Sequence, residues 1–95
     1  MRFKPIETGQ RIRRLRESLG LTQIQFAEMF HITRAFCSRI ETGSKAPSID
    51  LLVDISEKTG VTLDYLIIGK GYAASRIKQE VRALITSLEE LERQL

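Results

Sequence analysis

Two threonines, eleven positions apart, constrain the fold of this 95-residue chain more than any other feature. Thr22 is followed three positions later by Gln25, and this pair can satisfy the first free N–H groups of a helix. Thr33 occupies the same place before the next helical segment. Only three or four residues, Phe30 to Thr33, are left to connect the two helices. A connection this short predicts two helices that cross steeply.

The other segments also have helical spacing, and we find no alternating pattern typical of a strand. We predict a first helix over about 9–19, a third over 33–42, a fourth over 48–60 and a short fifth over 62–66. The chain is therefore expected to be all-α. The residues expected to face the core are Ile12, Leu15, Leu19, Phe26, Ala27, Phe30, Phe36 or Cys37, Ile40, Leu51, Leu52, Ile55, Val61, Leu63 and Leu66.

The positive charge is concentrated in the first half of the chain. Residues 1–45 carry nine Lys and Arg against four acids, whereas residues 46–70 carry two against four. Residues 71–95 carry four of each sign. A local basic excess is what an anionic partner docking on one face requires, although a solvated basic surface explains it equally well.

The composition argues against an enzyme or a metalloprotein. One cysteine excludes an internal disulfide, one histidine leaves no metal-ligand cluster, and no Gly-rich phosphate loop is present. We therefore expect no catalytic activity, no cofactor, no metal and no small-molecule substrate. Apolar runs of four residues or fewer fall short of the roughly 20 that cross a membrane. The first ten residues lack the apolar block of a signal peptide, so we expect a cytoplasmic protein.

The last segment, over about 73–95, has a different pattern. Apart from Ile85, its strongly apolar residues are spaced by four and three positions in strict alternation, which is a heptad seam. A lone amphipathic helix of about 20 residues is marginal in water, so the seam needs a partner. We expect a second copy of the chain as that partner, and folding back onto the same subunit stays open. The expected dimer-interface residues are Ile77, Val81, Leu84, Leu88, Leu91 and Leu95.

The charged residues beside the seam help to distinguish a parallel from an antiparallel pair of helices. Lys78 and Glu92 occupy the same flanking heptad position, so an antiparallel pair brings them together across the seam. A parallel pair places Glu80 near Ile85 and gains no charge match. Antiparallel pairing is mildly favoured, and a homodimer of that kind is two-fold symmetric.

Short segments spread over about two-thirds of the chain form a pattern that is specific in its order and spacing. They are Arg11-Ile12-Arg13-Arg14-Leu15-Arg16, Leu21-Thr22-Gln23, Phe26-Ala27, Ile32-Thr33-Arg34, Ser38-Arg39-Ile40-Glu41, Gly43, Pro47-Ser48 and Gly60-Val61-Thr62-Leu63-Asp64-Tyr65-Leu66. In this arrangement the region from Gln10 to Gly69 resembles the phage repressor/Cro-type (XRE-like) helix-turn-helix family. The resemblance implies a five-helix repressor-like domain, usually dimeric, that binds DNA and regulates transcription.

The sequence departs from that family at two positions. His31 stands in the turn where Gly is usual, and Cys37 stands at an inward position where Ile or Val is usual. His tolerates a positive backbone angle better than β-branched residues do, and Cys37 is expected to act as a small buried hydrophobe. Phe36 either packs over the edge of the core, which we favour, or reaches a thymine methyl group. Glu41 is expected to pair internally with an arginine of the first helix.

The resemblance divides the chain into an N-terminal arm (1–8), a DNA-binding domain (9–69) and a C-terminal dimerisation helix (70–95). The helix over 33–42 is expected to enter the major groove, where each base pair has a distinct donor and acceptor pattern. Arg34, close behind the N-cap, is expected to fork onto a guanine. The expected base contacts are Arg34, Ala35, Ser38 and Arg39, and the expected DNA-backbone contacts are Gln23, Thr33, Thr42, Ser44, Lys45, Arg11 and Arg14.

These observations predict a sequence-specific double-stranded DNA-binding transcriptional regulator. We expect a repressor that binds a palindromic operator as a homodimer, with a protein partner as one means of control. The alternative is a protein-interaction module, such as an antitoxin-like protein whose C-terminal helix binds a different protein.

Overall fold

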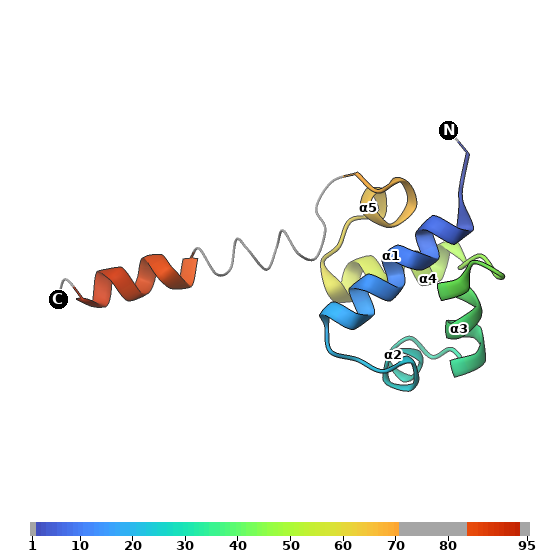
Figure 1. Cartoon of the computed structure of the whole chain (residues 1–95), viewed down its shortest axis with the longest axis horizontal. Coiled ribbons are helices and arrows are strands. Elements are labelled where there is room, and N and C mark those ends of the chain that lie inside the picture. The colour runs from blue at the N-terminus through green and yellow to red at the C-terminus, as the bar shows by residue number, and fades with distance from the viewer. Residues whose placement is uncertain (1, 71–83, 94–95) are drawn as a thin grey trace.

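The computed structural model describes residues 2–70 and 84–93, and within these ranges it contains helices and no strand (Figure 1). Residues 84–93 are helical, and five labelled helices precede them. Their bounds are α1 (Pro5–Ser18), α2 (Gln23–Met29), α3 (Arg34–Thr42), α4 (Ile49–Thr59) and α5 (Leu63–Ile68). The all-α prediction and the order of the five helices are confirmed.

Hydroxyl side chains begin four of the five labelled helices. Thr22 Oγ1 accepts a hydrogen bond from the Gln25 backbone N–H at 3.1 Å, and the Thr22 N–H donates to Gln25 Oε1 at 2.9 Å. Thr33, Ser48 and Thr62 each accept from the backbone N–H three residues on. The predicted starts of α2 to α5 are confirmed because an N-cap is a local interaction between residues close in sequence.

The first helix begins four residues earlier than the sequence predicted. Pro5 occupies the first turn of α1, where its missing N–H costs nothing and its fixed φ suits the helix. Thr8 and Gly9 are buried, and a Cβ on Gly9 would lie 2.0 Å from the Ile40 carbonyl oxygen. The backbones of α1 and α3 therefore meet here. The prediction of an arm over 1–8 is wrong for residues 5–8, because they form the first turn of a packed helix.

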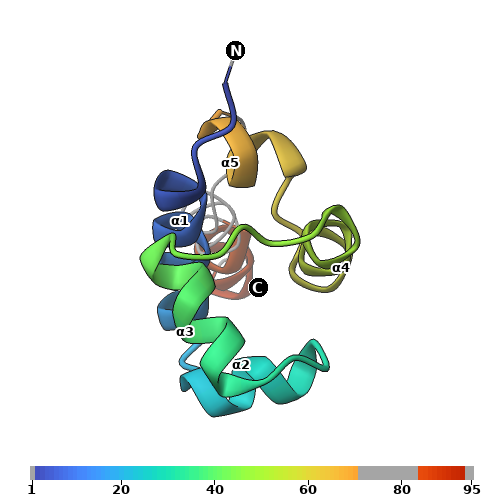
Figure 2. The same cartoon turned by 90° about the vertical axis from the view of Figure 1, so that its right-hand side faces the viewer.

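The domain is built around α1, which packs against both α3 and α5. Helix α2 packs on α3, and α4 packs on α5. Figure 2 shows α2 and α5 at opposite ends of the domain, with α3 running towards α2. The α2–α3 pair is therefore presented at one end.

Most of the predicted core is confirmed. The buried apolar side chains are Ile12, Leu15, Phe26, Ala27, Phe30, Cys37, Ile40, Leu51, Leu52, Ile55, Val61 and Leu66, and Phe36 packs on this cluster while partly exposed. Two predicted core residues lie outside it: Leu19 is 45% exposed and Leu63 is 37% exposed. Leu19 follows the last residue of α1, where the chain turns away at Gly20, and Leu63 is the first residue of α5.

Candidate nucleic-acid interface

A four-residue connection sets the angle between α2 and α3. The Ile32 N–H donates to the Ala27 carbonyl at 3.0 Å, and the His31 N–H donates to the Glu28 carbonyl at 3.3 Å. His31 has a φ of 55°, the left-handed conformation that favours glycine. The predicted tight turn is confirmed, and a histidine occupies its most demanding position.

Lys58, near the end of α4, supports this turn from the protein side. Its ammonium group donates to the Met29 carbonyl at 3.2 Å and lies 5.2 Å from the centroid of the Phe30 ring. A cation at the end of α2 is favourable because the helix dipole is negative there. This contact has no local signature in the sequence, because Lys58 and Met29 lie 29 positions apart.

The outward face of α3 carries the side chains predicted to read bases. Arg34, Ala35 and Arg39 are exposed and Ser38 is half-buried, whereas Cys37 is buried. An open hollow of about 550 Å³ lies beside this face; it is lined by His31, Ile32, Thr33, Ala35, Phe36 and Arg39. The four predicted base-contact residues therefore belong to one accessible surface at the end of the domain.

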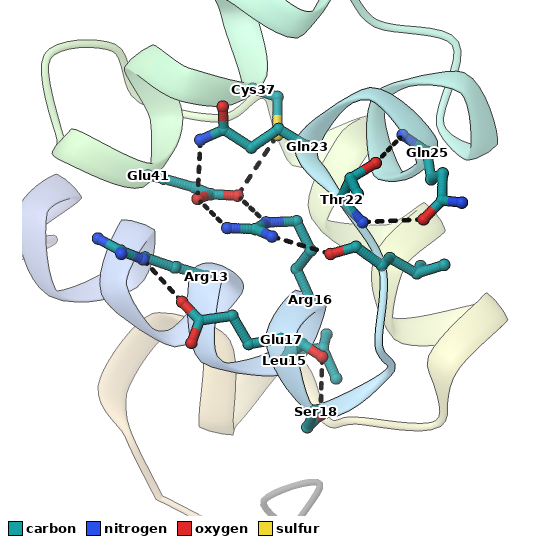
Figure 3. A network of polar contacts seen from close by, with 11 residues as sticks. Arg13, Leu15, Arg16, Glu17, Ser18, Thr22, Gln23, Gln25, Cys37 and Glu41 are labelled. Carbon is teal, nitrogen blue, oxygen red and sulfur yellow. Dashed lines mark hydrogen bonds and ion pairs between the residues drawn. The ribbon is translucent and has the colours of Figure 1, made fainter.

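The inward face of α3 is held by a buried ion pair (Figure 3). Arg16 Nε donates to Glu41 Oε2 at 2.7 Å and Arg16 Nη2 donates to Glu41 Oε1 at 3.0 Å. A third N–H of Arg16 donates to the Leu21 carbonyl at 2.8 Å. The predicted internal pairing of Glu41 with an arginine of the first helix is confirmed. This pair ties α3 to α1 and to the loop before α2.

Two further side chains complete the hydrogen bonding of the Glu41 carboxylate. Gln23 Nε2 donates to Oε1 at 3.2 Å, and the Cys37 thiol donates to Oε2 at 3.4 Å. Gln23 is the first residue of α2, so the network reaches α1, α2 and α3. Two N–H groups of Arg16, one of Gln23 and the Cys37 thiol thus all donate to the Glu41 carboxylate. These bonds fix the position of α3 relative to α1 and α2.

The protonation states of this cluster follow from its burial and its hydrogen bonds. Burial opposes ionisation of Glu41, but the hydrogen bonds from Arg16, Gln23 and Cys37 outweigh it and lower the pKa of the carboxyl. The hydrogen bond to Glu41 raises the pKa of Arg16. Burial, then the charge and hydrogen bond of Glu41, raise the pKa of the Cys37 thiol to about 12. Cys37 is 1% exposed and stays a protonated thiol, as predicted for a buried hydrophobe rather than a redox sensor.

The remaining arginines of α1 differ in their partners. Arg11 donates to the Leu66 carbonyl at 3.2 Å, and its guanidinium lies 3.6 Å from Glu7. It therefore closes the C-terminal end of α5, a role that the sequence analysis did not assign to it. Arg13 pairs with Glu17 at 2.8 Å on the surface. Arg14 is exposed, and no carboxylate of the described residues pairs with it.

The cations of α3 and of the loop that follows have no such partners. Arg34, Arg39 and Lys45 are exposed, and within residues 2–70 and 84–93 none of them forms an ion pair. Their charges are therefore available to an external anion.

The side chains predicted to contact the DNA backbone differ in whether they still have a hydrogen to donate to a phosphate. Thr33 Oγ1 accepts from the Phe36 N–H, so its own hydrogen remains to donate, and the Gln23 amide uses one of two hydrogens on Glu41. The hydroxyls of Thr42 and Ser44 instead donate to the Arg39 carbonyl at 3.1 and 3.3 Å. These two hydroxyls shape the end of α3.

The predicted dimer-interface residues are only partly within the described ranges. Leu84, Leu88 and Leu91 are 65%, 62% and 58% exposed. The other three, Ile77, Val81 and Leu95, lie outside the described residues.

Among the described residues, no helix is long and apolar enough to span a membrane. No group of three or more His, Cys, Asp or Glu side chains in those ranges could hold a metal ion.

The five-helix fold, with a tight turn between α2 and α3 and a cationic outward face on α3, defines a helix-turn-helix domain. The chain belongs to the helix-turn-helix family, whose sequence profile matches residues 12–66.

Known relatives include regulators of transcription. The chain is 34% identical to the HTH-type transcriptional activator BcrR of Enterococcus faecalis over 65 residues, which cover 68% of this chain and 32% of BcrR. It is 34% identical to the uncharacterized HTH-type transcriptional regulator YqaE of Bacillus subtilis (strain 168) over 72 residues, 76% of this chain and 60% of YqaE. The chain therefore spans about a third to three-fifths of these curated relatives.

A solved structure supports the same assignment. The fold is similar to that of the P22 c2 repressor protein, solved in complex with synthetic operator 9T in the presence of Tl⁺. The TM-score is 0.62 and the sequence identity is 27%, over 66% of this chain and 96% of that protein.

Proposed function

We propose that this chain is a sequence-specific double-stranded DNA-binding transcriptional regulator that acts without catalytic activity in the cytoplasm. The observation that carries the proposal is the set of exposed cations on and after α3 that form no ion pair with any described residue, namely Arg34, Arg39 and Lys45. It is supported by the family and by the P22 c2 repressor, which was solved with an operator. Phosphates supply most of the affinity of such proteins, and unpaired cations are what neutralise them.

Base reading is assigned to the N-terminal half of α3, inserted in the major groove. Arg34 can fork onto guanine O6 and N7, which is worth about 1–3 kcal/mol of discrimination. Ala35 offers a methyl group to a thymine, and Ser38 and Arg39 reach a base edge or an adjacent phosphate. All four lie on the accessible face of α3 described above.

Backbone docking is assigned to the start of α2 and to the flanks of α3. The N–H groups and positive dipole at the start of a helix favour a phosphate. The second amide hydrogen of Gln23, the hydroxyl hydrogen of Thr33 and the Lys45 ammonium are the donors we assign to phosphates. Arg14 adds attraction at longer range, and Arg11 adds only its charge because its guanidinium is held by α5. Thr42 and Ser44 act by setting the loop that carries Lys45.

Repression, a palindromic operator and a homodimer complete the proposal. A bound dimer at an overlapping promoter excludes polymerase without any further activity. Two-fold symmetry predicts half-sites about 34 Å apart, one helical turn of DNA.

The second candidate is a protein-interaction module, and a specific observation favours it. The leucines of helix 84–93 are more than half exposed, so a different protein could cover them. Such a partner would either replace the second copy or control its DNA binding. Self-association of the purified protein separates the two: Leu84→Glu with Leu88→Glu gives monomers if the seam forms the homodimer.

The test is selection from a random duplex library with purified full-length protein at physiological salt. Enrichment of a palindrome is the expected result, and its half-site spacing reports the dimer geometry. Salt-sensitive binding without enrichment of any sequence would refute a sequence-specific regulator that acts alone.

A further inference from the structure

Of the residues that the structure describes, His31 alone combines a side chain with a left-handed backbone, at a φ of 55°. Glycine adopts this conformation at no steric cost, whereas a residue with a Cβ loses free energy in it. The other left-handed positions in the described ranges are all glycines, namely Gly20, Gly43, Gly60 and Gly69. A histidine at the one remaining position points to a role for its side chain.

The imidazole of His31 is free to act on an external group. The residue is exposed, and its backbone N–H already donates to the Glu28 carbonyl. Its ring forms no hydrogen bond or ion pair with any residue of 2–70 or 84–93. The turn is held by backbone bonds and by Lys58, so the ring is not needed to hold it.

His31 lines the open hollow beside α3, and the polar groups around that hollow are donors. Thr33 keeps its hydroxyl hydrogen because its oxygen accepts from the helix, and the Arg39 guanidinium can only donate. None of the six lining residues is acidic. Figure 2 shows the connection between α2 and α3 at the end of the domain where these helices are presented. A hollow with such donors suits an anion.

We infer that His31 donates to a DNA phosphate at this hollow and that the contact strengthens when its imidazole is protonated. The inference rests on the proposed DNA binding, and it adds a further contact residue and a dependence on pH.

Protonation changes what an imidazole offers to a phosphate. The neutral ring has one N–H and no charge, whereas the imidazolium has two N–H groups and a positive charge. Histidine is the side chain that gains its proton between about pH 8 and pH 5, and His31 is the only histidine of the chain. The affinity for DNA is therefore expected to rise as the pH falls through this range.

The charged groups around His31 are mainly cations. Arg39 lines the same hollow, Arg34 begins α3 three positions on, and Lys58 of α4 is bonded to the end of α2. The acid nearest in sequence is Glu28 of α2, which is exposed and forms no ion pair with His31. These cations oppose protonation of the ring in the free protein, whereas a bound phosphate favours it. Protonation and DNA binding are therefore expected to promote each other.

The experiment measures the affinity of the full chain for a pool of random-sequence duplexes at pH 6 and pH 8. His31→Gly removes the ring and suits the left-handed backbone, so urea unfolding should show a domain at least as stable as the wild type. His31→Lys fixes a positive charge at the same position and keeps the cost of a Cβ. The α-amino group also titrates near pH 8, but it is common to all three proteins.

We expect His31→Gly to bind about fivefold more weakly than the wild type at pH 6, the upper value for one exposed ion pair, and within about twofold at pH 8. Its slope of log affinity against log salt at pH 6 should be smaller by about 0.9 per domain. His31→Lys should lose most of the pH dependence and bind at pH 8 about as tightly as at pH 6. A purely structural role predicts the opposite for glycine, which the turn favours.

Equal affinities of the wild type and His31→Gly at both pH values would overturn the inference and leave the proposed DNA binding intact. A loss in His31→Gly that is the same at pH 6 and pH 8 would also overturn it, because a protonated ring would not be responsible. If the wild type binds no duplex at either pH, the proposed function itself is refuted, and the inference with it.

Discussion

Helices α1 and α3 both carry arginines, yet they use them differently. Arg11 and Arg16 of α1 bind a helix-end carbonyl and a buried carboxylate. Arg34 and Arg39 of α3 are exposed and have no carboxylate partner within the described ranges. The residue type is the same in both helices. The difference teaches that Arg16 and Arg11 of α1 hold α3 and α5 in place, whereas the arginines of α3 are available to a ligand.

This contrast also separates two kinds of contribution to DNA binding. In the proposed function, Arg16 contributes to DNA binding only by fixing α3 through Glu41, together with the Gln23 amide and the Cys37 thiol. Arg34 is proposed to contact DNA directly, and among the described residues no carboxylate pairs with it. Substitution of Arg16 is therefore expected to lower the free energy of unfolding, whereas substitution of Arg34 is expected to change DNA binding.

The largest expected effect comes from Arg16→Met. Removing one partner of a buried ion pair leaves the Glu41 charge uncompensated, at a cost of about 3–5 kcal/mol. Arg16 and Glu41 side chains are only 12% and 3% exposed, which justifies the buried-pair magnitude. The free energy of unfolding in urea measures the loss. Arg13→Met is the matched control, since its pair with Glu17 is exposed and is worth less than about 1 kcal/mol. Equal losses in the two variants would contradict the structural role of Arg16.

The pH dependence of stability tests the contribution of Glu41 to the same buried ion pair. Because the pKa of Glu41 is lower in the folded chain, its contribution to stability is complete above the ordinary carboxyl pKa of about 4.5. The contribution is lost as the pH falls through the folded value. We expect Glu41→Gln to be less stable at neutral pH and to lose less further stability on acidification. Urea unfolding between pH 7 and pH 3 measures both. An unchanged acid dependence in Glu41→Gln would show that other carboxyls cause it.

A smaller effect, and one on specificity rather than stability, is expected for Arg34→Ala. Loss of a bidentate contact to guanine removes about 1–3 kcal/mol of discrimination at one base pair per half-site. The free energy of unfolding should change by less than about 0.5 kcal/mol, because the Arg34 side chain is exposed. Competition between operators that differ at single positions measures the change. Arg14→Ala serves as the exposed α1 control. A uniform loss of affinity for all sequences would remove Arg34 from the base-reading set.

The smallest effect is expected for Lys45→Ala. A lysine on one phosphate contributes alike to all sequences, so the variant should bind every duplex more weakly. It should also reduce the slope of log affinity against log salt by about 0.9. Lys70→Ala changes the charge equally and follows α5, so its slope should stay near the wild-type value. Equal slope changes in the two variants would show that only net charge matters.

Much of the fold could be predicted because its signals are local. The N-caps at Thr22, Thr33, Ser48 and Thr62 were found from neighbouring residues, and the buried positions followed from helical spacing. The start of α1 was missed because the first turn is held by contact with α3, across more than 30 positions. Within the candidate site, the outward placement of Arg34, Ala35, Ser38 and Arg39 was predicted from the same periodicity.

The partners of polar side chains were harder to predict. That Arg16 and not another arginine of α1 reaches Glu41 depends on the crossing angle of two helices. The bond from Lys58 to the Met29 carbonyl likewise needs α4 folded against α2. Neither contact has a signature in its neighbouring residues.

The sequence by itself determined where α2 to α5 begin, most of the buried residues and the membership of a helix-turn-helix family. Capping and periodicity act within a few residues, so they can be found without the fold. Only the tertiary structure decided which arginines are bound within the protein and which remain unpaired. That choice depends on which atoms packing brings within hydrogen-bond distance, and residues far apart in the chain meet only after the helices have packed.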